Sequence, residues 1–207
     1  MRTFVYVDGF NLYYGALRKT PWKWLDLVAL AGRVLRPHHQ IVTLRYFTAK
    51  VSETVRDPTK PHRQDSYLRA LRAIRPEVEV HFGHFLTHRV WMPLVRPIGD
   101  QRMVEVFKSE EKGTDVNLAV HLLNDAGLDA YDCAVIMSND SDLAEAMRLV
   151  RHRHGKRIGL VKPGTGRLSQ QLMAHADFLR PIRFSHLQNS QLPDPIPGTN
   201  IRKPAAW

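Results

Sequence analysis

The 207-residue sequence has a single cysteine, Cys133, and few acids, twenty against thirty lysines and arginines. One cysteine excludes an internal disulfide framework and is typical of a reducing compartment. No apolar run approaches the roughly 20 residues that a membrane span needs. The first eight residues, MRTFVYVD, already contain an acid, which argues against a signal peptide. We therefore expect a cytoplasmic protein with no membrane association, and nothing in the sequence indicates a homo-oligomer.

The shortage of acids gives the chain a formal net charge of +10. So basic a protein favours a polyanionic partner, and nucleic acid is the first choice because no basic amphipathic helix suggests a membrane surface. The alternative is a basic protein that is merely soluble. An apolar content of 43% is ordinary for a globular domain.

Short apolar runs alternate with helical patterns along most of the chain. Helical spacing is clear, for example, where Leu27, Leu30 and Val34 fall on one face. Strands are expected at residues 3–7, 41–51, 78–85, 133–137 and 158–161. This alternation predicts right-handed βαβ units, and therefore a three-layer α/β/α fold with a mainly parallel sheet of about five strands.

Two regions interrupt the alternation. Residues 86–110 contain prolines and a Gly-Asp turn, and are expected to form a hairpin-like insertion within a domain spanning residues 1–184. The basic and aromatic side chains there suit a clamp on single-stranded nucleic acid, although a plain surface insertion is the alternative. The side chains concerned are Arg89, Trp91 and Arg96. Residues 185–207 are rich in proline and are expected to form a C-terminal tail.

Acidic residues follow the predicted strands at the places where these strands end. Because ligands of open parallel sheets bind beyond the carboxyl ends of the strands, we expect these acids to share one rim. They are Asp8, Asp115, Asp140 and Asp142. Like charges about 4 Å apart repel by roughly 4 kcal/mol at a surface-like dielectric, so a cation is expected among them. Oxygen ligands favour Mg²⁺ or Mn²⁺, which can activate water against a phosphodiester.

Each acid also has a structural interpretation. Asp142 and Glu145 have the spacing of a helix capping box. Asp115 suits the first turn of a helix through the macrodipole. Asp8 could pair with Lys112, because a charge at the end of a buried strand is costly when it is unpaired.

Four segments resemble, in order, the motifs of the NYN domain family, a branch of PIN-like metal-dependent ribonucleases that includes the LabA-like proteins. The segments are FVYVDGFNLYYG, KGTDVNLAVHLL, YDCAVIMSNDSDLAEAMRLVRHRHGKRIGL and LSQQLMAHADFLRPI, which together span roughly residues 3 to 184. The resemblance implies a PIN-like fold, Mg²⁺ or Mn²⁺ held by acids, and hydrolysis of RNA by metal-activated water. The matching positions are Asp8, Asn11, Asp115, Ser138, Asp140 and Asp142. Many relatives have aspartate where this chain has His121.

The leading hypothesis is a divalent-metal-dependent ribonuclease. Its catalytic residues would be Asp8, Asn11, Asp115, Asp140 and Asp142, with the four aspartates holding the metal. Lys112 and Ser138 would contact substrate, with Ser138 either orienting a carboxylate or binding phosphate. Lys162, in the loop VKPGTGRLS, could grip a phosphate, although an ordinary connection is the alternative.

Two other functions stay open at this point. The first is a non-catalytic RNA-binding regulator on the same fold. The second is a small-molecule phosphatase or receiver-like domain, which is disfavoured because no Asp-x-Asp phosphoacceptor motif follows the first strand.

Overall fold

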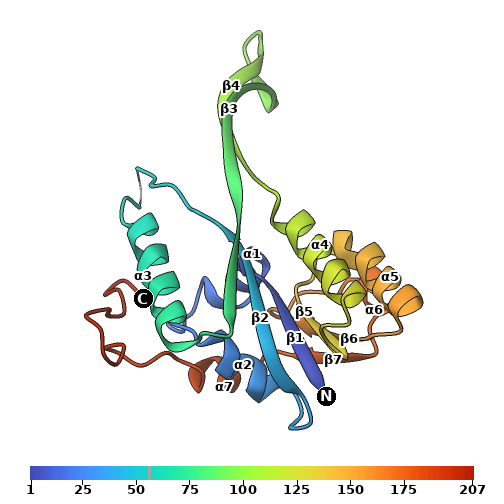
Figure 1. Ribbon diagram of the computed structural model, residues 1–207. Coiled ribbons are helices and arrows are strands. Elements are labelled where there is room, and N and C mark those ends of the chain that lie inside the picture. The colour runs from blue at the N-terminus through green and yellow to red at the C-terminus, as the bar shows by residue number, and fades with distance from the viewer. Residues whose placement is uncertain (56) are drawn as a thin grey trace.

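A seven-stranded sheet forms the centre of the computed structural model, which describes residues 1–55 and 57–207 (Figure 1). Its strand order is β4-β3-β2-β1-β5-β6-β7, and all neighbours are parallel except β3 and β4. The strands are β1 Arg2–Asp8, β2 Gln40–Ala49, β3 Val78–Ile98, β4 Gln101–Lys112, β5 Cys133–Met137, β6 Arg157–Lys162 and β7 Phe178–Pro181. The mainly parallel α/β architecture confirms the prediction from the alternating pattern.

The expectation of about five strands is wrong, because β4 and β7 add to the five runs that the sequence suggested. β4 lies largely within the expected hairpin-like insertion. Both of its faces are open to solvent, so it lacks a continuous apolar run that would predict a strand of the sheet. β7 is a four-residue edge strand with alternating exposure, so its apolar signal is short. It follows a short helix, Gln170–Met173.

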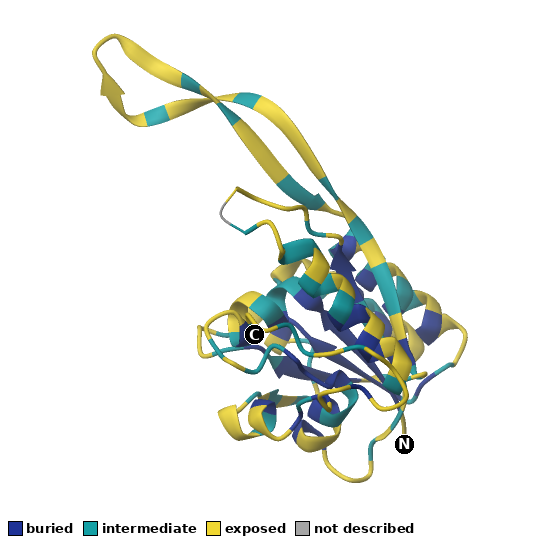
Figure 2. Ribbon diagram, turned by 90° about the vertical axis from the view of Figure 1, so that its left-hand side faces the viewer, coloured by how far each residue is buried: buried dark blue, intermediate teal, exposed yellow. Residues whose placement is uncertain are grey.

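Helices cover both faces of the sheet, as Figures 1 and 2 show. The helical elements are α1 Gly9–Leu12, a π-helical turn η1 Tyr13–Leu17, α2 Leu27–Val34, α3 Lys60–Ile74, α4 Thr114–Gly127, a 3-10 turn η2 Ser141–Leu143, α5 Ala144–His154, α6 Gln170–Met173 and α7 Phe184–Gln188. Within the described part of the chain, none of these helices is both long enough and apolar enough to span a bilayer.

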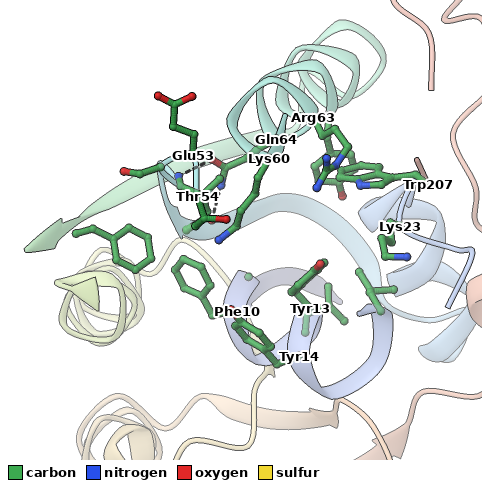
Figure 3. Close-up of a pocket in the computed structure, with 18 of the residues that line it drawn as sticks. Phe10, Tyr13, Tyr14, Lys23, Glu53, Thr54, Lys60, Arg63, Gln64 and Trp207 are labelled. Atoms are coloured by element: carbon green, nitrogen blue, oxygen red, sulfur yellow. Dashed lines mark hydrogen bonds between the residues drawn. The ribbon is translucent and has the colours of Figure 1, made fainter. Parts of the chain in front are cut away.

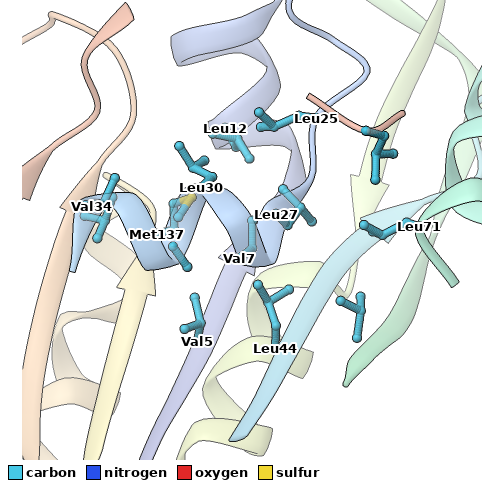
Figure 4. Close-up of a cluster of buried hydrophobic side chains, with 14 of the residues drawn as sticks. Val5, Val7, Leu12, Leu25, Leu27, Leu30, Val34, Leu44, Leu71 and Met137 are labelled. Carbon is cyan, nitrogen blue, oxygen red and sulfur yellow. The ribbon is translucent and has the colours of Figure 1, made fainter. Parts of the chain in front are cut away.

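Strand β1 lies between the two hydrophobic cores, and every residue after Arg2 is buried. Side chains of a strand alternate between faces, so Val5 and Val7 enter one core and Phe4 and Tyr6 the other. Figure 4 shows Val5 and Val7 beneath the apolar face of α2. Burial on both faces explains why this strand is an almost continuous apolar run.

The strand order reverses at β1, because β2 pairs on one side of it and β5 on the other. A crevice opens beyond the carboxyl ends of the strands at such a switch point. Asp8 is the last residue of β1. The topology thus places this acid at the position where α/β proteins bind ligands.

The insertion predicted near residues 86–110 is the distal part of a two-stranded arm. β3 leaves the parallel sheet and pairs antiparallel with β4, from His84 opposite Lys112 to Pro93 opposite Met103. The arm projects away from the body of the domain, and most of its residues are exposed (Figures 1 and 2).

The proline-rich residues 185–207 pack against the domain. Leu187, Leu192 and Ile196 are buried in the core that contains α2. The Leu192 amide donates to the Trp24 carbonyl at 2.8 Å, and the Trp207 ring lies 6.3 Å from the Trp24 ring. This segment therefore completes one hydrophobic core.

Candidate active site

Asp8 is buried at the carboxyl end of β1, with 4% of its surface exposed. Its carboxylate accepts the Asn11 amide at 2.9 Å, which caps α1, and the Ser138 hydroxyl at 2.9 Å. Burial raises the pKa of Asp8 above its ordinary value, and these hydrogen bonds oppose that rise. Asp8 has no ion-pair partner among the described lysines and arginines, so its predicted alternative as a partner of Lys112 is wrong.

Two polar side chains connect the end of β1 to the end of β5. The Ser138 hydroxyl donates to Asp8 and accepts the Asp140 amide at 3.1 Å, and Ser138 is fully buried. The Asn11 side-chain oxygen accepts the Asn139 amide at 3.2 Å. Ser138 is therefore placed to orient a carboxylate, the first of its two predicted roles.

The two acids after β5 lie in different surroundings. Asp140 caps η2 by accepting the Asp142 amide at 3.0 Å, and it faces the same cavity as Asp8. Asp142 is exposed and does not line that cavity. The capping box expected for Asp142 and Glu145 does not form, because Asp140 caps this turn and Glu145 pairs with Arg148 at 2.6 Å.

Asp115 approaches the same cavity from the first turn of α4. Its pKa is raised to about 6, first by burial and then by the negative charges of Asp8, Asp140, Glu111 and Asp142. Acids from distant segments therefore line one cavity. Asp8, Asp115 and Asp140 thus lie together at one rim of the sheet, as the sequence predicted.

The cavity between these acids has a volume of about 260 Å³. Its lining residues are Asp8, Phe10, Asn11, Tyr14, Phe85, Glu111, Thr114, Asp115 and Asp140. We did not predict Glu111, which accepts the backbone amide of Thr114 at 3.1 Å and its hydroxyl at 2.5 Å. Glu111 lies in the polar run SEEKGTD, four residues before Asp115, and this run has no apolar pattern that would predict a strand leading to the rim.

None of the acids in this cavity is neutralised by a described lysine or arginine. Lys112 turns to Glu110 at 3.0 Å, and Lys108 binds the same carboxylate at 2.5 Å. As the side chains stand, residues 1–55 and 57–207 contain no three acids, histidines or cysteines close enough to ligate one ion. The donors still fit a hard cation in chemistry, because all of them are oxygens. Burial and then the nearby negative charges raise the pKa of Asp115, so a bound cation would be stabilised there.

Other predicted substrate contacts lie outside the acidic cavity. Lys162 hydrogen-bonds the Gly166 carbonyl within its own loop and lines a neighbouring cavity with Asn11 and Asn139. Arg89, Trp91 and Arg96 are on the projecting arm, where Trp91 is 64% exposed. The structure thus separates these arm residues from the acidic site, and Arg89 already pairs with Glu105 at 3.7 Å.

A larger cavity of about 580 Å³ adjoins the acidic one and was not predicted (Figure 3). The two cavities share Phe10, Tyr14 and Phe85 as a common wall. Other aromatic and basic side chains line it, from α1, η1, β2, α3 and the C-terminal segment. Its residues are scattered between positions 9 and 207, so no local motif could reveal it.

The chain belongs to the NYN domain family, because a family model described as the NYN domain matches residues 2–182. This confirms the family that the sequence motifs predicted. The fold is similar to that of a Vibrio parahaemolyticus protein of unknown function, with a TM-score of 0.57 and 18% identity. The likeness covers 88% of this chain and 93% of that one.

One relative of this chain is named as a monooxygenase and not as a nuclease. The chain is 34% identical to 6-hydroxy-3-succinoylpyridine 3-monooxygenase HspA of Pseudomonas putida strain S16. The match covers 100% of this chain and 75% of the relative.

We predict that the contribution of Asp115 to the stability of the metal-free protein becomes less favourable as the pH rises from about 4 to about 6. Because the pKa of Asp115 is raised in the folded state to about 6, the folded state binds this proton more tightly than the unfolded state does. Asp115→Asn should therefore be more stable than the wild type at pH 7 by about 1 kcal/mol, discounted for partial exposure.

The difference between the two proteins should shrink toward zero below pH 4. Urea denaturation at pH 3.5, 5 and 7 in chelator measures it. A difference that stays constant with pH would mean that Asp115 is not perturbed.

Proposed function

We propose that the protein is a metal-dependent hydrolase of RNA phosphodiester bonds. The observation that supports this most strongly is the acidic cavity, where Asp8, Asp115 and Asp140 converge without a cationic partner among the described residues. A chain of net charge +10 that keeps such a cavity has the two parts that a nuclease requires. Basic surface attracts the polyanion, and carboxylates recruit the cation.

The proposed metal ligands are Asp8, Asp115 and Asp140, with Asp142 at the exposed rim. Their oxygen donors suit Mg²⁺ or Mn²⁺, which would supply an activated water and neutralise charge on the phosphoryl group. Asn11 and Ser138 hold Asp8 in place through their hydrogen bonds. Asp115, with a pKa of about 6, is mostly ionised at pH 7 and is therefore available to bind a cation.

The proposed RNA contacts lie around this site. Lys112 is on the arm beside the cavity with its side chain half exposed, and Lys162 lines the neighbouring cavity. Further along the arm, Arg89 and Arg96 would contact phosphates while Trp91 stacks on a base.

We expect purified protein to cleave single-stranded or structured RNA only when Mg²⁺ or Mn²⁺ is present. The double variant Asp8→Asn with Asp140→Asn should lose at least about 100-fold in cleavage rate, because it removes two of the negative ligands. Gel analysis of labelled RNA measures the rate. Asp65→Asn is the matched control, since Asp65 is an exposed acid on α3.

Binding of RNA without cleavage in either metal would contradict the hydrolase. It would favour the alternative of a non-catalytic RNA-binding regulator. Cleavage that survives in the double variant would point to a contaminating nuclease.

The arm makes a separate prediction about RNA binding. Replacing Arg89 and Arg96 by glutamine should lower the slope of log K against log salt by about 1.4, because each lost phosphate contact on a single strand removes about 0.7. Trp91→Ala should cost about 1–3 kcal/mol of binding energy through lost stacking. Fluorescence anisotropy with a labelled oligonucleotide over a salt series measures both.

The matched control for the arm replaces Arg33 and Arg36, which are exposed at the end of α2 and just after it. These changes should leave the salt slope unaltered. Equal effects of the two double variants would show that the arm makes no specific contribution.

A second candidate function is oxidation of a small heteroaromatic acid. The relative named as a monooxygenase raises it, and the 580 Å³ cavity beside the acidic site favours it. This candidate predicts oxygen uptake that depends on 6-hydroxy-3-succinoylpyridine and on a two-electron reductant such as reduced nicotinamide. An oxygen electrode measures it, with RNA in place of the pyridine as the control. No uptake, with or without added flavin and metal, would remove this candidate.

A further inference from the structure

The larger cavity has an aromatic side. Phe10, Tyr13 and Tyr14 come from the consecutive elements α1 and η1 and lie along one side of it (Figure 3). The Phe10 and Phe85 rings meet edge to face at 5.7 Å. Because such ring pairs fix one another in place, this side offers a preformed surface for a planar ring.

The opposite side of the cavity is basic. Lys60, Arg63 and Gln64 of α3 lie across from the aromatic residues, and Lys23 lies at one end (Figure 3). Glu53 is the one acid among the described lining residues, and its carboxylate is exposed and directed away from the cavity. The lining therefore carries an excess of positive charge.

Two of the cations that line this cavity, Arg63 and Lys23, have unusual surroundings. Arg63 is fixed by Asp57, with one nitrogen 2.8 Å from a carboxylate oxygen, and its buried Nε has no hydrogen-bond partner among the described residues. The pKa of Lys23 is lowered by burial and by the positive charges of Lys203 and Arg63. Because Asp57 already pairs with Arg63, Lys60 and Lys23 are the lining cations that have no carboxylate partner among the described residues.

We propose that this cavity binds a free heteroaromatic acid, with its ring against Phe10 and Tyr14 and its carboxylate beside Lys60 and Arg63. The volume of about 580 Å³ lies within the range of roughly 300–1,000 Å³ typical of small-molecule sites. Since Phe10, Tyr14 and Phe85 also line the acidic cavity, the ring would lie next to the candidate active site. The inference rests on the second candidate function only where it concerns a reaction of the bound acid. Binding of the acid can be tested without any reaction.

Isothermal titration calorimetry of the full chain tests the assignment with four probes. The acid is 3-(pyridin-3-yl)propanoate, and its amide, 3-(pyridin-3-yl)propanamide, keeps the ring but removes the charge. Propanoate keeps the charge but removes the ring, and adenosine monophosphate represents a nucleotide. We expect the acid to bind about tenfold more tightly than the amide, because one charge-assisted contact is worth about that factor. Propanoate should not bind measurably.

The Lys60→Gln variant should weaken binding of the acid about tenfold and leave binding of the amide unchanged. Lys19→Gln is the matched control, because Lys19 is exposed and lies outside the lining. It should bind both probes as the wild type does.

Several results would overturn the inference. They are no binding of the acid, equal binding of acid and amide, insensitivity to Lys60→Gln, or tighter binding of adenosine monophosphate than of the acid. Binding of the acid without oxygen uptake would support the ligand site and remove the second candidate function. RNA cleavage without binding of the acid would overturn the ligand site and leave the nuclease proposal in place.

Discussion

The buried carboxylate of Asp8 is the constraint on which the rest of the site depends. It ends the central strand at the point where the strand order reverses, and it is held by Asn11 from the following helix and Ser138 from the end of β5. A buried carboxylate is costly, and it persists because two donors satisfy it. The same hydrogen bonds fix the relative positions of β1, α1 and β5. The site and the central packing are therefore coupled.

The candidate active site is acidic although the chain as a whole carries a positive net charge. A chain with a net charge of +10 leaves Asp8, Asp115 and Asp140 without described cationic partners, whereas buried Asp125 pairs with Arg45 at 2.8 Å and with the Tyr6 hydroxyl at 2.6 Å. Asp125 is a satisfied structural acid. The cavity at the carboxyl ends of the strands therefore differs from the core in having acids without cationic partners, which is typical of a functional site.

Each of the two candidate functions is based on a different cavity: hydrolysis on the acidic cavity, and oxidation on the larger aromatic one. The family and the acidic cavity support our proposal of phosphodiester hydrolysis, whereas a relative at 34% identity is named a monooxygenase of a substituted pyridine. One fold hosts unrelated chemistries because function depends on the side chains at the site. In this chain the acidic cavity and the aromatic cavity share Phe10, Tyr14 and Phe85 as lining residues.

The sequence by itself determined the family, the parallel α/β architecture and the rim at which Asp8, Asp115 and Asp140 meet. These follow from local patterns, because a buried strand is apolar and its terminal acid stands out. The two additional strands were missed because an exposed arm and a four-residue edge strand have weak apolar signals. Only the tertiary structure placed Glu111 beside Asp115, turned Lys112 toward Glu110 and left Asp142 exposed. It alone also built the aromatic cavity, whose walls come from segments that are distant in sequence, so that their contacts depend on packing and not on local periodicity.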